Sequence, residues 1–147
     1  MKTSTSRLSI VWSIALLVLF MPFSAIAVET NELLGHWYGE GEYDNEIKTK
    51  WLTIREANGY LSVKVRYYKD GMFVSEAMST GTWKLDGERY IATYSATNAR
   101  VESPPQVHQY ELLGFDGDVL TYQSLRRDQF LGTIYQVRRV QSDFALP

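Results

Sequence analysis

The stretch Leu33-Leu34-Gly35-His36-Trp37-Tyr38-Gly39-Glu40-Gly41-Glu42-Tyr43 predicts the first strand of a small closed β-barrel. Gly35 has no side chain to obstruct the chain where it enters the barrel. Trp37 is large and apolar enough to plug one end of such a barrel. Successive side chains on a strand point to opposite faces, so an inward Trp37 places His36 outside.

Turn signals divide the rest of the chain at even spacing. An Asp or Asn before Gly provides the positive φ that tight hairpin turns require. Prolines cannot donate to a sheet, so the polar stretch 98–106, with Pro104-Pro105, predicts a longer loop. The predicted connections are Asp44-Asn45, Asn58-Gly59, Asp70-Gly71, Asp86-Gly87, 98–106, Asp116-Gly117 and Arg127-Asp128.

Seven connections imply eight strands, and the segments between them alternate as strands do. The segments 60–67 and 89–96 each alternate with a period of two. The segments 119–126 and 130–139 are rich in residues that favour a pleated surface. We expect an all-β fold, an eight-stranded antiparallel up-and-down barrel, because pairing the first strand with the last removes both exposed edges. A β-sandwich is the alternative.

The N-terminus has the pattern of a secretory signal peptide. Lys2 and Arg7 precede the apolar run 10–21, and Ala25-Ile26-Ala27 provides small residues for cleavage after Ala27. The apolar run is short for a membrane span, although an uncleaved anchor is the alternative. We therefore expect a periplasmic or secreted bacterial protein with one domain, residues 28–147, and no membrane span in its mature form.

Charge and cysteine content narrow the class of protein further. Residues 28–147 contain 13 basic and 17 acidic residues, a net charge of −4, which argues against nucleic-acid binding. The chain has no cysteine, so neither disulfides nor acylation at a cysteine are available. Core burial and backbone pairing must then stabilise the fold.

The chain resembles the lipocalins and the wider calycin superfamily, and most closely the compact lipocalin-like domains of bacteria. Gly35 and Trp37 match the Gly-x-Trp of the first strand, and Arg138 or Arg139 matches an arginine late in the last strand. The resemblance implies that the guanidinium packs across the indole to close the barrel. The Thr-Asp-Tyr element of many lipocalins is absent.

Two related barrels with known ligands fit less well, and no cofactor is expected. Avidin-like barrels hold biotin with tryptophans in their second half, but no Trp follows Trp83 here. Nitrobindin-like barrels share Gly-x-Trp-x-Gly-x-Gly and hold haem through a histidine near the C-terminus. His36 and His108 are the only histidines, and they lie too far apart for metal-ligand spacing.

Aromatic residues are the most informative candidates for a binding site. Rings with a polar tip suit an apolar pocket that orients its ligand by hydrogen bonds, although a filled core is an equally good interpretation. Gly81-Thr82-Trp83 repeats the Gly-x-Trp pattern and predicts a second interior anchor. An arginine that faced inward would require an anionic partner. The predicted ligand-binding residues are Trp37, Trp51, Tyr67, Trp83, Tyr94, Tyr122 and Arg126.

Three functions remain open from the sequence. The first is a binding protein for a small apolar or amphipathic molecule, with the 98–106 loop as a lid. The second is a module that binds a protein partner, such as a periplasmic hydrolase inhibitor. The third is a small isomerase or cyclase. The sequence has no Gly-x-Ser-x-Gly and no phosphate-loop motif, so no catalytic residue is assigned.

Overall fold

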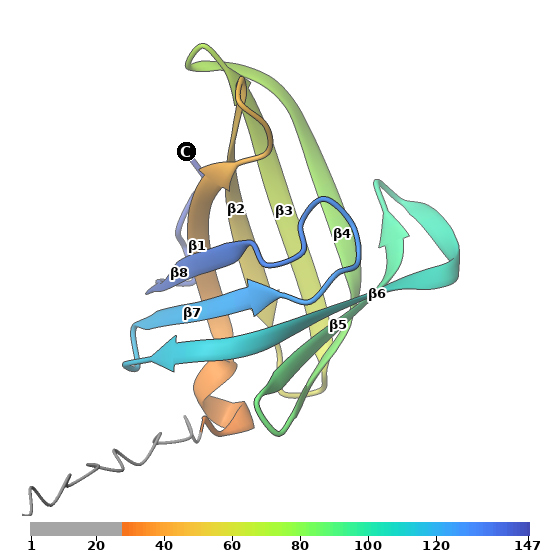
Figure 1. Ribbon diagram of the computed structural model, residues 1–147, viewed down its shortest axis with the longest axis vertical. Helices are drawn as coiled ribbons and strands as arrows, with labels where there is room; N and C mark the ends of the chain where they lie inside the picture. Colours follow the sequence, from red (N-terminus) through yellow and green to blue (C-terminus); the bar gives the residue numbers. More distant parts are fainter. Residues whose placement is uncertain (1–27) are drawn as a thin grey trace, which may run out of the picture.

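The computed structural model describes residues 28–147, and the predicted signal peptide lies outside the described residues. A short 3-10 helix, η1, precedes eight strands in chain order (Figure 1). Among the described residues, no helix is long and apolar enough to cross a membrane. The elements are η1 (Thr30–Leu33), β1 (Gly35–Glu42), β2 (Ile47–Arg55), β3 (Tyr60–Lys69), β4 (Met72–Asp86), β5 (Arg89–Thr97), β6 (Arg100–Phe115), β7 (Val119–Ser124) and β8 (Ile134–Val140).

The strands form a closed antiparallel barrel in which each strand pairs with the next. The register between β1 and β8 runs from His36↔Val140 to Gly39↔Val137. This pairing satisfies the two edges that an open eight-stranded sheet would leave exposed. The predicted up-and-down barrel is therefore confirmed.

Most of the predicted turns also lie where the sequence places them. Gly59, Gly71 and Gly117 have φ values of +83°, +77° and +97°, which L-residues with side chains rarely adopt. Asp70 shares the left-handed conformation of Gly71, with φ of +50°, as a two-residue hairpin requires. The β4–β5 turn differs by one residue, because it is formed by Gly87 and Glu88.

The prediction that 98–106 is a lid-like loop is wrong. β5 and β6 continue through this region and turn at Asn98 and Ala99, both with positive φ. The ladder pairs Ala96 with Val101 and then Tyr94 with Gln106, so residues 102–105 bulge from β6. Both prolines lie in that bulge, where the ladder requires no donor. Residues 95–107, here called the β5–β6 arm, project from the barrel (Figure 1).

The longest connection instead joins β7 to β8 and spans residues 125–133. The predicted strands here were too long, since β7 ends at Ser124 and β8 begins at Ile134. Asp128 accepts a hydrogen bond from the amide of Phe130, and Gly132 has φ of +78°. These local bonds compete with strand pairing and hold the segment as a loop.

One end of the barrel, here called the floor, is closed by η1, Trp37 and Arg139. Trp37 is fully buried, and its Nε1 donates to the carbonyl of Leu33 at 3.0 Å. The Arg139 guanidinium lies 4.4 Å from the Trp37 ring centroid and donates to the carbonyls of Glu32, Leu34 and Gly117. Arg139 is thus the arginine that packs across the indole.

Arg138 lies on the outer surface instead, because neighbouring residues on a strand face opposite ways. Its guanidinium stacks on Tyr38 at 5.0 Å and on Phe144 at 5.7 Å. Tyr38 is only 6% exposed, since Phe144 of the C-terminal segment covers it. The two adjacent arginines therefore stabilise different faces of the barrel wall.

Candidate ligand-binding cavity

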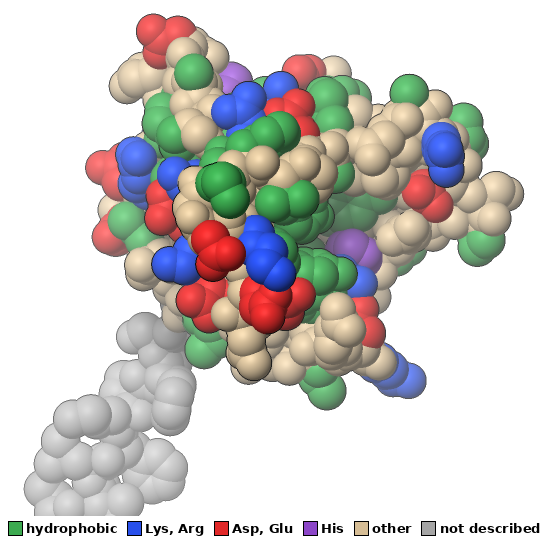
Figure 2. Space-filling view, turned by 90° about the horizontal axis from the view of Figure 1, so that it is seen from above, with side chains coloured by type: hydrophobic (Ala, Val, Ile, Leu, Met, Phe, Trp, Pro, Cys, Tyr) green, Lys and Arg blue, Asp and Glu red, His purple; other side chains and the backbone are tan. Residues whose placement is uncertain are grey.

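The barrel interior holds a cavity of about 270 Å³ that opens at the end opposite the floor, here called the mouth. Viewed from above, hydrophobic side chains surround a hollow with a histidine in its wall, and charged groups lie around it (Figure 2). Rings with hydroxyl tips dominate the lining. The tyrosines that line it are Tyr43, Tyr67, Tyr90, Tyr94, Tyr110, Tyr122 and Tyr135.

β2 contributes one full face to this cavity. Its buried residues alternate with less buried ones, and Thr49, Trp51, Thr53 and Arg55 all line the cavity. Trp51 requires the absence of a side chain at Gly39, since a Cβ there would lie 2.3 Å from the indole. The neighbouring β1 is therefore shaped around the Trp51 ring.

The tyrosine rings pack against one another as well as against the cavity. Tyr90 stacks on Tyr110 with centroids 5.5 Å apart, and Tyr110 meets Tyr122 edge-on at 5.2 Å. Tyr135 lies 5.5 Å from Tyr122 and 5.8 Å from Trp51. Offset and edge-on ring pairs stabilise each other beyond simple area burial. The rings thus form a rigid aromatic wall rather than a loose set of side chains.

The phenols of Tyr94, Tyr110 and Tyr122 are neutral at physiological pH. Burial raises the pKa of Tyr94, Tyr110 and Tyr122 above the usual range for a phenol. Each neutral hydroxyl can donate one hydrogen bond and accept others. The wall can therefore orient a polar group on a ligand, but it adds no negative charge to the cavity.

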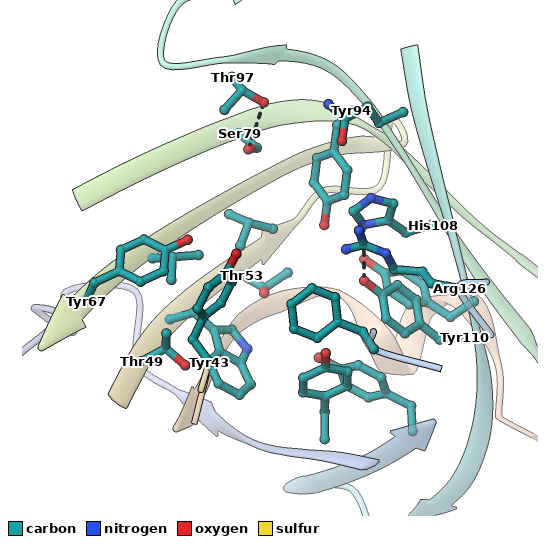
Figure 3. Close-up of a pocket in the computed structure, with 18 of the residues that line it drawn as sticks. Tyr43, Thr49, Thr53, Tyr67, Ser79, Tyr94, Thr97, His108, Tyr110 and Arg126 are labelled. Carbon is teal, nitrogen blue, oxygen red and sulfur yellow. Dashed lines mark hydrogen bonds between the residues drawn. The ribbon is translucent and has the colours of Figure 1, made fainter. Parts of the chain in front are cut away.

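Beside the tyrosines, the cavity wall carries two further polar side chains, His108 of β6 and Arg126 of the β7–β8 loop (Figure 3). His108 packs edge-on against Tyr94 at 5.0 Å, and its Nδ1 lies 3.4 Å from the Tyr110 hydroxyl. Burial, together with the nearby Arg126, lowers the pKa of His108 to about 4. His108 is consequently an uncharged imidazole at neutral pH.

Side chains from opposite walls border the mouth. Arg126 forms an ion pair with Asp128 and lies 5.0 Å from the Phe130 ring centroid. Tyr43 contacts Phe130 at 5.7 Å and Tyr67 at 5.8 Å, so three rings lie together at this end. Within residues 28–147, no group of three or more His, Cys, Asp or Glu could hold a metal ion.

The structure brings five of the seven predicted ligand-binding residues together. Trp51, Tyr67, Tyr94, Tyr122 and Arg126 all line the cavity, although Arg126 lies on the β7–β8 loop rather than in a strand.

The other two predicted residues, Trp37 and Trp83, do not line the cavity. Trp37 lies in the floor. Trp83 donates from Nε1 to the carbonyl of Glu56 at 3.1 Å and packs on Tyr90 at 6.2 Å. Both indoles fill space at the floor end of the barrel, because Glu56 directly follows Arg55, which pairs with Gly35 at the start of β1.

Sequence reasoning missed Arg55, the charged residue that lines the cavity near the floor. Its side chain is 2% exposed and lies 5.8 Å from Trp37 and 4.5 Å from Tyr90, measured to the ring centroids. The sequence does contain an indication that Arg55 faces inward, because it stands four positions after Trp51 and so shares the same face of the strand. Arg66, a strand arginine on β3, forms an ion pair with Glu76 instead.

No protein-family model matches the chain, and no curated protein sequence matches it.

Proposed function

We propose that this protein is a lipocalin-like binding protein that holds one small apolar or amphipathic molecule inside its barrel. The observation that supports the proposal most strongly is the cavity of about 270 Å³, lined by aromatic rings with hydroxyl tips. Ligand sites in proteins are mostly apolar and contain a few placed polar groups, with volumes of about 300–1,000 Å³. A cavity near the lower limit of that range favours a single short chain or a small ring system.

Binding inside the barrel is testable with a neutral fluorescent probe such as N-phenylnaphthylamine. Decanol should displace the probe, with one molecule bound per chain. Ser79→Phe fills the cavity from β4 and should weaken binding by at least about tenfold. Thr82→Phe adds the same ring at an exposed position of the same strand and should bind as the wild type does.

Two results would contradict this function. One is an absence of saturable binding to a folded protein across probes and alcohols of several sizes. The other is equal binding by the Ser79→Phe and Thr82→Phe variants, with circular dichroism showing both to be folded. Native mass spectrometry of protein purified from its own host adds an independent measurement, in which a bound small molecule is expected.

The same proposal includes export of the protein to the periplasm or the medium. It is supported by the charged start, the apolar run and the small residues before Val28. Mature protein recovered from a bacterial host should begin at Val28 when its N-terminus is sequenced. An intact N-terminus on membrane-associated protein would favour the uncleaved-anchor alternative.

A protein-binding role, such as hydrolase inhibition, is the second candidate, and the β5–β6 arm favours it. The arm projects from the barrel, and it carries Val101 at 84% and Val107 at 54% exposure. Exposed apolar side chains on a projecting hairpin are a feature of protein interfaces. The double variant Val101→Ser, Val107→Ser should then abolish capture of a protein partner while leaving binding of the fluorescent probe unchanged. Unchanged capture of the partner would show that the β5–β6 arm does not form the interface.

A further inference from the structure

Arg55 is a buried cation, and two of its three guanidinium nitrogens have no hydrogen-bond partner in the described part of the chain. Its Nε and Nη1 atoms are closed off from solvent and have no hydrogen-bond partner within residues 28–147. The four ion pairs found in this part of the chain involve other residues, so no carboxylate neutralises Arg55. A buried charge is ordinarily both paired and hydrogen-bonded.

The rings around Arg55 do not replace those partners. Tyr90 and Trp37 attract the guanidinium through their aromatic rings at 4.5 and 5.8 Å. Such contacts involve the π-systems, whereas the five N–H groups of a guanidinium lie in its plane. The two rings therefore orient Arg55 while leaving Nε and Nη1 without acceptors among the described residues.

The rest of the cavity offers no compensating negative charge at that depth. The nearby phenols of Tyr94 and Tyr122 are kept neutral by burial, which raises their pKa. Among residues 28–147, Glu42 is the only acidic residue that lines the cavity. It ends β1, whereas Arg55 pairs with Gly35 at the start of that strand. Positive charge thus lies near the floor and aromatic surface lies above it.

We propose that Arg55 binds the carboxylate of a monoanionic amphipathic ligand, with the apolar part of the ligand directed toward the mouth. This inference rests on the function proposed above and specifies the ligand class. A planar carboxylate matches the fork of a guanidinium and accepts two parallel hydrogen bonds. One cation at this depth, with Arg126 and Glu42 lying at the mouth, favours a single negative charge over a phosphate dianion.

Matched probes separate the head group from the apolar body. Decanoate and decanol share a chain and differ in charge, and decylamine reverses the charge. Isothermal titration calorimetry at pH 7 should show decanoate binding at least about tenfold tighter than decanol. Decylamine should bind least, because its ammonium group would meet the Arg55 charge in a poorly hydrated interior.

Arg55→Met keeps much of the side-chain length and removes the charge. It should weaken decanoate binding by about 100-fold or more and leave decanol binding within about threefold of the wild type. Arg138→Met removes a cation from the outer surface of the barrel, outside the cavity, and should leave decanoate affinity within about threefold of the wild type. The ligand-free Arg55→Met protein should unfold at the same or a higher temperature than the wild type.

The outcomes distinguish this inference from the proposed function. Equal affinities of the wild type for decanoate and decanol would overturn the role of Arg55 and leave the binding function standing. Retained preference for decanoate in a folded Arg55→Met variant would do the same. Failure of every amphiphile to bind the wild type would overturn both. If Arg55→Met does not fold, the affinities of the wild type for decanoate, decanol and decylamine still show whether the cavity prefers a carboxylate.

Discussion

Substitution of Arg139 by alanine tests whether the floor depends on that side chain. The guanidinium donates at 2.7 Å to the Glu32 carbonyl, at 2.8 Å to that of Leu34 and at 3.1 Å to that of Gly117. It also covers the Trp37 ring at 4.4 Å. One side chain therefore joins the end of η1, the start of β1 and the β6–β7 turn.

The expected loss of stability follows from these contacts. A hydrogen bond from a charged donor contributes about 1.5–3 kcal/mol, and a partly exposed cation–π contact about 0.5–1 kcal/mol. Water can replace the guanidinium at the more exposed carbonyls, so the three bonds together contribute less than their sum. We expect Arg139→Ala to lower the free energy of unfolding by about 3–4 kcal/mol.

The adjacent Arg138 provides a matched control. It is exposed and stacks on Tyr38 and Phe144 outside the barrel. Removing that contact should cost about 1 kcal/mol or less. Urea unfolding followed by tryptophan fluorescence and by far-ultraviolet circular dichroism measures both variants, with the transition slopes compared to detect changes in the unfolded state.

Losses of equal size in the two variants would refute the claim that Arg139 closes the floor. A larger loss for Arg138→Ala would refute it as well. An unchanged near-ultraviolet circular dichroism spectrum of Arg139→Ala, together with full stability, would show that Trp37 packs without the cation.

Two further predictions concern the cavity wall. Gly39→Ala should lower the free energy of unfolding by about 1–3 kcal/mol, because its Cβ would lie 2.3 Å from the Trp51 ring. Gly41→Ala, whose Cβ would lie 3.3 Å from the same ring, should lower it by less. Equal losses of the two variants in urea unfolding would contradict this prediction. His108 has a folded-state pKa of about 4, below its unfolded value of about 6.5. Between these two pH values the unfolded state binds more protons than the folded state, so the free energy of unfolding should fall as the pH falls from about 6.5 to about 4. The free energy of unfolding should fall by about 2 kcal/mol after allowance for partial exposure of the imidazole, and His108→Gln should abolish this pH dependence. An unchanged pH profile of stability in that variant would contradict the lowered pKa of His108.

The fold was predictable from the sequence because its signals are local and mutually consistent. Dipeptides such as Asp70-Gly71 mark tight turns, and period-two alternation marks the strands between them. Closure followed because eight paired strands would otherwise leave two edges. Errors arose where strands depart from regular pairing, as at the bulge of residues 102–105, since polar and proline-rich composition does not distinguish a bulged hairpin from a loop.

The candidate site was predictable only in part, because alternation gives the face of a residue but not its depth along the barrel. Trp37 and Trp51 both point inward, yet the first packs in the floor and the second lines the cavity. Depth depends on strand stagger, which no short pattern encodes. Arg55 was missed because a strand arginine is usually solvated, and only the register with Gly35 places it near the floor.

The ring signals of the ten tyrosines test the central claim most directly. In protein carrying ¹³C-labelled tyrosine, titration with decanoate should shift the rings that line the cavity, above all Tyr94, Tyr110 and Tyr122. Tyr38, Tyr60 and Tyr68 do not line it and should keep their positions. Shifts confined to those three outer rings, or none at saturating decanoate and decanol, would contradict a ligand-binding barrel interior.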